Sequence, residues 1–185
     1  SHIHPTIRCS THIHVNVSRM SHRQIYNAVG YYFLLEELLV QTQGPLRIGN
    51  LFCLRMSDAE TIAHDLSESV RRATGFTQFS MDSHKYGAVN LAAVRKFGSL
   101  EFRFFRPLKT QQIAFWTKLL HRMIRNAADI PLSRPVDLLE KSRYTDVLRL
   151  CLLDEEIDVL TQGVVWQPLL ETNFESIADL AKALE

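Results

Sequence analysis

The chain has 185 residues, a formal net charge of +1, 46% apolar residues and 22% charged residues. This size and composition are typical of a globular protein with a substantial core, and they exclude a disordered chain. A near-neutral charge without long runs of one sign disfavours binding to a nucleic-acid backbone, and no apolar run reaches the roughly 18 residues of a membrane span.

The three cysteines, Cys9, Cys53 and Cys151, are widely separated and lack C-x-x-C spacing. This usage disfavours a disulfide framework and a cysteine zinc site, and it favours a reducing compartment. The first residues also lack the apolar region of a signal peptide. We therefore expect a cytoplasmic protein.

Residues 11–18 (THIHVNVS) alternate strictly between polar and apolar side chains, which predicts a β-strand. His12 and His14 share its polar face. Ser21 then starts a long helix, with Gln24 at the spacing of a capping box, and a Gly-Pro pair after residue 43 ends it. The apolar stripe of this helix should lie against the aliphatic face of the strand.

The middle of the chain is less regular. Residues 46–56 mix arginines with apolar residues and give no clear assignment, whereas residues 57–72 begin with a cap and an acidic first turn and predict a second helix. Residues 74–83 have turn chemistry and predict a loop. Residues 86–96 are compatible with a strand or a short helix.

A second alternating strand covers residues 99–107 (SLEFRFFRP). Its period of two places three side chains on an apolar face and three on the opposite face, namely Leu100, Phe102 and Phe104 against Glu101, Arg103 and Phe105. A carboxylate and a guanidinium two residues apart are thus held side by side on a rigid element. This arrangement favours a site for a shared ligand.

Thr110 is expected to cap a helix from about residue 111 to residue 128, and several short amphipathic helices follow within residues 136–184. The acids around Asp154 are typical of a helix N-terminus. We therefore expect an α+β fold in which helices cover one face of an antiparallel sheet. Residues 1–130 would form the core, and residues 131–185 a helical extension.

The order of these pieces resembles the amidoligases found in phage and bacterial genomes. The resemblance rests on the His-x-His strand, the long helix, the Asn90 segment (KYGAVNLAAVRKFG) and the LEFRF strand before a helix, and it covers about residues 9–127. More distantly, the same pieces resemble the C-terminal half of the glutamine synthetase catalytic domain. The expected fold is accordingly the glutamine synthetase-like catalytic fold without its first strands.

This resemblance implies ATP-dependent joining of a carboxylate to an amine through an acyl phosphate, with Mg²⁺ or Mn²⁺ as the metal. It implies His12 and Glu101 as metal ligands, Arg103 as the anion clamp that acts with Glu101 in catalysis, and His14 as a phosphate contact. Asn90 and Arg106 are further candidates for contacts with the nucleotide. The substrates would be small-molecule or peptide carboxylates and amines.

The family pattern also includes upstream strands with a Glu-x-Glu pair of acidic ligands, and the sequence shows no such strands before residue 11. One imidazole and one carboxylate are too few protein ligands for a two-metal centre. We therefore expect a fragment, a site completed by a partner chain or a second copy, or a descendant that has lost activity.

Two alternatives stay open at this stage. A domain of this kind that lacks its acidic strands could be a non-catalytic module of a phage or bacterial assembly. Alternatively, the pairs His2-x-His4 and His12-x-His14 could bind zinc on adjacent strands, as in metal-dependent hydrolases. Tightly held zinc would favour the hydrolase, and the absence of ATP binding would favour the module.

Overall fold

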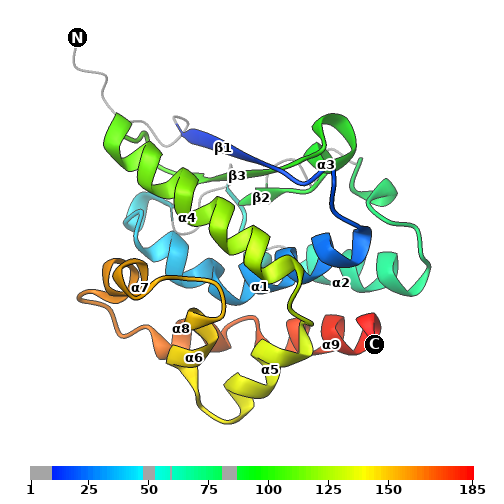
Figure 1. Cartoon of the computed structure of the whole chain (residues 1–185). Coiled ribbons are helices and arrows are strands. Elements are labelled where there is room, and N and C mark those ends of the chain that lie inside the picture. Colours follow the sequence, from blue (N-terminus) through cyan, green and yellow to red (C-terminus); the bar gives the residue numbers. More distant parts are fainter. Residues whose placement is uncertain (1–9, 48–52, 59, 81–86) are drawn as a thin grey trace.

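The computed structural model describes residues 10–47, 53–58, 60–80 and 87–185. Its sheet contains β1 (Thr11–Asn16), β3 (Ser99–Phe105) and β2 (Val89–Asn90), which are antiparallel and lie in the order β1-β3-β2. The long helix α1 (His22–Gln41) lies beneath the sheet in Figure 1, and α4 (Thr110–Ala128) runs across α1. The expected α+β class with an antiparallel sheet is confirmed, and helices make up most of the described chain.

The remaining elements connect the sheet to α1 or follow α4. Between β1 and β3 come the 3-10 turns η1 (Pro45–Arg47), η2 (Met56–Asp58) and η3 (Thr77–Ser80), and the helices α2 (Glu60–Arg71) and α3 (Ala92–Phe97). After α4 come α5 (Ser133–Glu140), α6 (Tyr144–Arg149), α7 (Asp154–Thr161), α8 (Gln167–Glu171) and α9 (Phe174–Leu184). The segment that the sequence left undecided between strand and helix therefore contains both, as β2 and α3.

The start of α1 confirms the predicted capping box. Ser21 Oγ accepts a hydrogen bond from the backbone N of Gln24 at 3.2 Å, and Gln24 Oε1 accepts one from the backbone N of Ser21 at 2.9 Å. The expected cap of α4 is wrong by one residue. Lys109 is its N-cap, with an extended backbone, and Thr110 is already helical.

An irregularity in the pairing of β1 with β3 changes the expected faces of β3. Thr11 pairs with Phe105 and Ile13 with Phe102, so the register shifts by one residue between these pairs. Such a bulge interrupts the alternation of side chains along the strand. Phe105 is consequently fully buried beside Phe104 and Trp116, with ring centroids 4.1 and 5.2 Å away. The prediction that Phe105 shares the face of Glu101 and Arg103 is therefore wrong.

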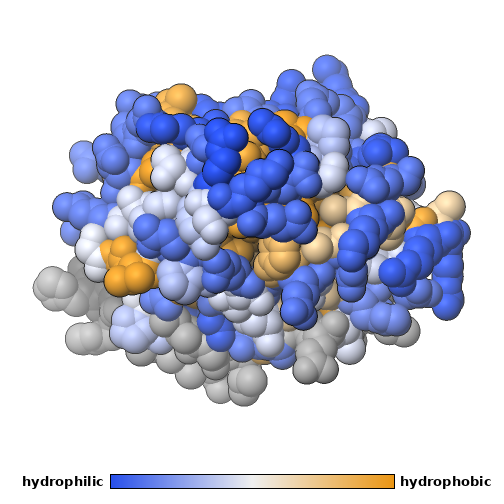
Figure 2. Space-filling model, turned by 90° about the horizontal axis from the view of Figure 1, so that it is seen from below, coloured by the Kyte–Doolittle hydropathy of each residue, from blue (hydrophilic) through white to orange (hydrophobic). Residues whose placement is uncertain are grey.

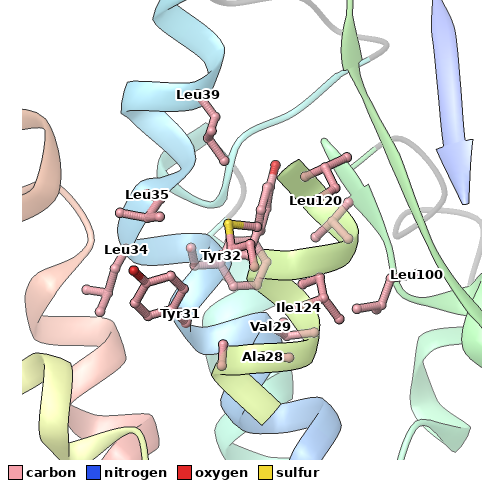
Figure 3. Close-up of a cluster of buried hydrophobic side chains, with 14 of the residues drawn as sticks. Ala28, Val29, Tyr31, Tyr32, Leu34, Leu35, Leu39, Leu100, Leu120 and Ile124 are labelled. Atoms are coloured by element: carbon pink, nitrogen blue, oxygen red, sulfur yellow. The ribbon is translucent and has the colours of Figure 1, made fainter. Parts of the chain in front are cut away.

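The core is organised around α1, which is buried along most of its length because it is covered on two sides. On the sheet side, the ring of Tyr32 lies 5.1 Å from that of Phe102. Figure 3 shows Tyr32 among residues of α4 and the sheet, whereas Tyr31 and Leu34 point to the opposite side, towards helices of the C-terminal part. There the hydroxyl of Tyr31 donates to the carbonyl of Val147 at 2.6 Å.

The C-terminal helices complete the cover of α1. Both α8 and α9 contact α1, and α9 also packs against α2. Asn173 Nδ2 donates to the backbone carbonyl of Phe33 at 2.9 Å, a bond that links the start of α9 to the middle of α1. Figure 2, seen from below, shows that the outer surface on this side is mostly hydrophilic, with apolar side chains in small areas. Within the described part of the chain, none of the helices combines the length and apolar character that a bilayer crossing requires.

Two neighbouring acids on α1 fix the connector before α2. Glu36 is fully buried, and its Oε2 accepts a hydrogen bond from the backbone N of Met56 at 2.7 Å. Glu37 binds Arg55 Nη1 at 2.6 Å, and Arg55 in turn binds Asp58. Because Leu54 bridges to Gly87 beside β2, these contacts tie α1 to the edge of the sheet.

Glu36 should make the stability of the protein depend on pH. Burial, with a smaller contribution from the neighbouring Glu37, raises the pKa of Glu36 from 4.5 to about 8. Between these two pH values the unfolded chain ionises Glu36 and the folded protein does not. We therefore expect the free energy of unfolding to fall with rising pH across this window, by up to about 1.4 kcal/mol per pH unit from this group.

Urea denaturation of the wild type and Glu36→Gln between pH 4 and pH 9 measures this effect. The wild type should lose stability relative to the variant from about pH 4.5 to about pH 8, with a constant difference outside that window. Parallel stability curves through the window would contradict the assignment.

Candidate functional site

Three strands bring three polar side chains into one row across the sheet. In the register of the ladders, Glu101 on β3 lies opposite His14 on β1 and opposite Asn90 on β2. Directly opposed residues of an antiparallel pair point to the same face, with Cβ atoms about 5 Å apart. Tyr32 of α1 packs against Phe102 of β3. Glu101 is the neighbour of Phe102 on this strand and points to the opposite face, so the row lies on the face away from α1. The sheet thus gathers side chains from residues 14, 90 and 101.

Glu101 is the centre of this cluster. Its Oε1 lies 2.7 Å from His12 Nδ1, 3.6 Å from Arg103 Nε and 3.9 Å from His14 Nε2. Its Oε2 accepts a hydrogen bond from Asn90 Nδ2 at 2.7 Å. The structure therefore brings together five of the six residues that the sequence indicated as site residues. We call these five residues, His12, His14, Asn90, Glu101 and Arg103, the carboxylate cluster.

The side chains of the cluster differ in solvent exposure, with a mostly buried carboxylate and more accessible imidazoles. The side chain of Glu101 is 12% exposed, whereas those of His12 and His14 are 35% and 44% exposed. Burial and the positive charge of Arg103 lower the pKa of His12 below 6.5, and these effects outweigh the attraction of Glu101 for its proton. His12 is therefore neutral at pH 7. Its Nδ1 faces the carboxylate of Glu101, so the lone pair of the ring is on Nε2, which lies 2.8 Å from Ser10 Oγ.

Arg103 keeps donor capacity within the cluster. Its Nε is buried and makes no hydrogen bond, although it lies within ion-pair distance of Glu101. A buried donor without a hydrogen-bond partner is costly unless a ligand or an ordered water supplies an acceptor. A guanidinium in this position suits an anion such as phosphate or carboxylate, which it can bind through two parallel hydrogen bonds.

Two serines of the site were missed in the sequence. Ser99 Oγ lies 2.9 Å from His14 Nδ1, and Ser10 Oγ lies 2.8 Å from His12 Nε2. Each of these contacts helps to fix the orientation of an imidazole ring. The alternation of β3 already places Ser99 on the face of Glu101, so the same pattern that indicated the glutamate could have indicated the serine. Ser10 lies just before β1 and carried no such signal.

Arg106 is not part of the carboxylate cluster. It lines a hollow between the end of α1, the start of α4 and α7, together with residues such as Gln43, Trp116 and Gln162. None of the five cluster residues lines this hollow. The reason is local, because Arg106 follows the end of β3 beyond the bulge.

Imidazole nitrogen and carboxylate oxygen are donor types that suit Mg²⁺ or Mn²⁺. Among the residues that the structure describes, no group of three or more histidines, cysteines and acids is arranged to hold a metal ion. His12 and Glu101 supply one nitrogen and one carboxylate of these donor types, and their nearest atoms lie 2.7 Å apart. His2 and His4, the other half of the zinc alternative, lie outside the described residues.

A buried carboxylate in contact with a guanidinium and two imidazoles is a candidate functional site. The model of the family described as "Putative amidoligase enzyme" matches residues 2–116, which is more than half of the chain and includes the whole cluster. The chain therefore belongs to this amidoligase family. No curated protein and no solved structure matches it.

Proposed function

We propose that the protein is an ATP-dependent carboxylate-amine ligase that forms an amide or peptide-type bond through an acyl phosphate. The observation that carries the proposal is the position of Glu101, held on one face of the sheet between His12, Arg103 and Asn90. Membership of the amidoligase family supports ligase chemistry independently. The three-stranded antiparallel sheet is compatible with a partial glutamine synthetase-like catalytic fold.

The proposed reaction has two steps. A carboxylate oxygen of the acid substrate attacks the γ-phosphorus of ATP, the bond to the β-phosphate oxygen breaks, and ADP leaves. The amine nitrogen then attacks the acyl carbon, its proton is lost, and inorganic phosphate leaves. Both steps bring anionic groups together, so the site must neutralise their charge.

The residues of the cluster have distinct tasks in this scheme. Arg103 binds the anion through its guanidinium, because its Nε makes no hydrogen bond in the protein alone. His14, the more exposed imidazole, contacts a phosphate oxygen, with its ring oriented by Ser99. Asn90 holds Glu101 through its amide and thereby positions the carboxylate. His12 and Glu101 are the residues that would hold Mg²⁺ or Mn²⁺, whose charge would neutralise the phosphates when bound.

Isothermal titration calorimetry with Mg²⁺-ATP tests the proposal. Arg103→Ala should weaken binding by about 10- to 100-fold, since a hydrogen bond to a charged group contributes about 1.5–3 kcal/mol. Arg106→Ala is the matched control, because this arginine lies on the same segment but outside the cluster, and it should change the affinity by less than about twofold. Release of ADP that requires both a carboxylate and an amine, with the amide identified by mass spectrometry, completes the test.

Each contrary result has a distinct meaning. If folded wild-type protein binds no Mg²⁺-ATP, the chain is a non-catalytic module, and the ligase proposal is wrong. If ATP binds and Arg103→Ala has the affinity of the wild type, the role given to Arg103 is wrong. A site completed by a second copy would be detected if activity rose more steeply than protein concentration.

A further inference from the structure

An exposed aromatic side chain stands beside the carboxylate cluster. Phe97, the last residue of α3, is 61% exposed. Single exposed apolar side chains are common on protein surfaces. This ring differs in its two neighbours, an imidazole of the carboxylate cluster and a lysine, because both groups can contact a nucleotide.

The first neighbour is His14. The rings of Phe97 and His14 lie with centroids 6.0 Å apart and planes at 84°, an edge-to-face contact. His14 is also the imidazole that faces Glu101 at the centre of the site. The exposed ring therefore adjoins the cluster directly.

The second neighbour is Lys96, whose Nζ lies 5.1 Å from the centre of the Phe97 ring. This cation–π contact occupies one side of the ring with a positive charge. The large exposed fraction of Phe97 leaves room for a second planar group. Proteins that bind single-stranded nucleic acids combine positive charges that contact the phosphates with aromatic side chains on which the bases stack, and a nucleotide offers the same two groups.

We propose that Phe97 is the stacking platform for the base of the nucleotide. This inference rests on the proposed function, because it assigns a base position for the nucleotide that the cluster binds through its phosphates. The base would stack on the face of Phe97 opposite Lys96. The chain of phosphates would extend over His14 towards Glu101 and Arg103.

The spacing along the chain agrees with this path. Ser99, Glu101 and Arg103 lie on the strand that follows Phe97, and the four steps from Ser99 to Arg103 span about 13 Å at the rise of a β-strand. The platform and the anion clamp thus lie at opposite ends of a row, as the base and the terminal phosphate do in an extended nucleoside triphosphate.

The backbone holds Phe97 in place. Gly98 has a φ of 65°, in the left-handed region, and ends α3 with hydrogen bonds from its N–H to the carbonyls of Ala93 and Val94. The carbonyl of Gly98 accepts a bond from the backbone N of Val17 at 2.8 Å, and a Cβ at Gly98 would lie 2.9 Å from Cβ of Ser18. Phe97 therefore sits next to a fixed turn clamped against the end of β1.

Calorimetry with two probes, Mg²⁺-ATP and Mg²⁺-tripolyphosphate, tests the inference. Tripolyphosphate has the phosphates and lacks the base. Phe97→Ala should weaken ATP binding by about 5- to 100-fold, the range expected for one base stacked on an aromatic ring, and should leave tripolyphosphate binding within about twofold of the wild type. Phe97→Leu, which retains apolar area without a π-face, should be intermediate.

A gain-of-signal variant provides a second readout. In Phe97→Trp, ATP should quench the added tryptophan fluorescence, measured against the wild type with its native tryptophans, and tripolyphosphate should not. This variant should keep ATP affinity within about threefold of the wild type, because indole stacks as well as phenyl.

Each contrary result overturns the inference in a recognisable way. Equal ATP affinity in the wild type and Phe97→Ala would show that Phe97 does not bind the base, with the proposed function unaffected. Equal weakening of both probes in Phe97→Ala would show a structural effect on the phosphate site. If the wild type binds neither probe, the proposed function fails, and the inference fails with it.

Discussion

Replacing Glu101 by glutamine should reduce the proposed ATP-dependent amide formation by at least about 100-fold, the usual effect of removing one central electrostatic group from an active site. The side chain keeps its size, but its negative charge is lost. Glu101 Oε1 lies 2.7 Å from His12 Nδ1 and 3.6 Å from Arg103 Nε, and the carboxylate is one of the two proposed metal ligands. The steady-state rate of ADP release that depends on both substrates measures the effect.

The control for this variant is Glu155→Gln, which removes an acid from the exposed first turn of α7. It should retain the activity of the wild type within about twofold, because exposed charges contribute little. Near-UV circular dichroism checks that Glu101→Gln is folded. Full activity of a folded Glu101→Gln variant would remove Glu101 from the mechanism and leave the cluster without its central group.

Replacing Phe102 by alanine should lower the free energy of unfolding by about 3–5 kcal/mol, the typical cost of a phenylalanine deleted from a core. Phe102 is fully buried at the centre of β3, where it pairs with both β1 and β2 and touches the ring of Tyr32. Deletion of the ring leaves a cavity between the sheet and α1. Urea denaturation followed by far-UV circular dichroism measures the loss.

Phe97→Ala is the matched control, because it makes the same substitution at an exposed ring. It should change the free energy of unfolding by less than about 0.5 kcal/mol. A comparable loss in both variants would mean that Phe97 is packed in solution. A small loss in Phe102→Ala would mean that the sheet and α1 do not share one core.

Features set by neighbouring residues were predictable from the sequence. The alternation of residues 11–16 and 99–104 predicted β1 and most of β3, and the Ser21–Gln24 spacing predicted the start of α1. The faces of these strands also predicted that His12, His14, Glu101 and Arg103 point the same way. These signals are local, since they depend on the period of a strand and on a hydrogen bond between residues three apart.

Features that depend on tertiary pairing were not predictable in this way. The bond from Asn90 to Glu101 requires β2 to lie beside β3 in one register, and a two-residue strand carries no periodicity. The bulge that moves Phe105 into the core likewise arises between two strands. The sequence pattern of α1 predicts either apolar or exposed side chains and does not predict the buried acids Glu36 and Glu37. Their burial is explained by hydrogen bonds from the connector, from the backbone N of Met56 to Glu36 and from the side chain of Arg55 to Glu37.

The two-sided burial of α1 has an evolutionary consequence. Residues matched by the family model end at 116, yet the side of α1 that carries Tyr31 is covered by helices that follow residue 133. These C-terminal helices therefore supply the surface that buries this side of α1. A homologue without this tail would need hydrophilic replacements at the position of Tyr31 and its neighbours, or another subunit there, so the composition of this one helix should reveal which members of the family inherited the tail.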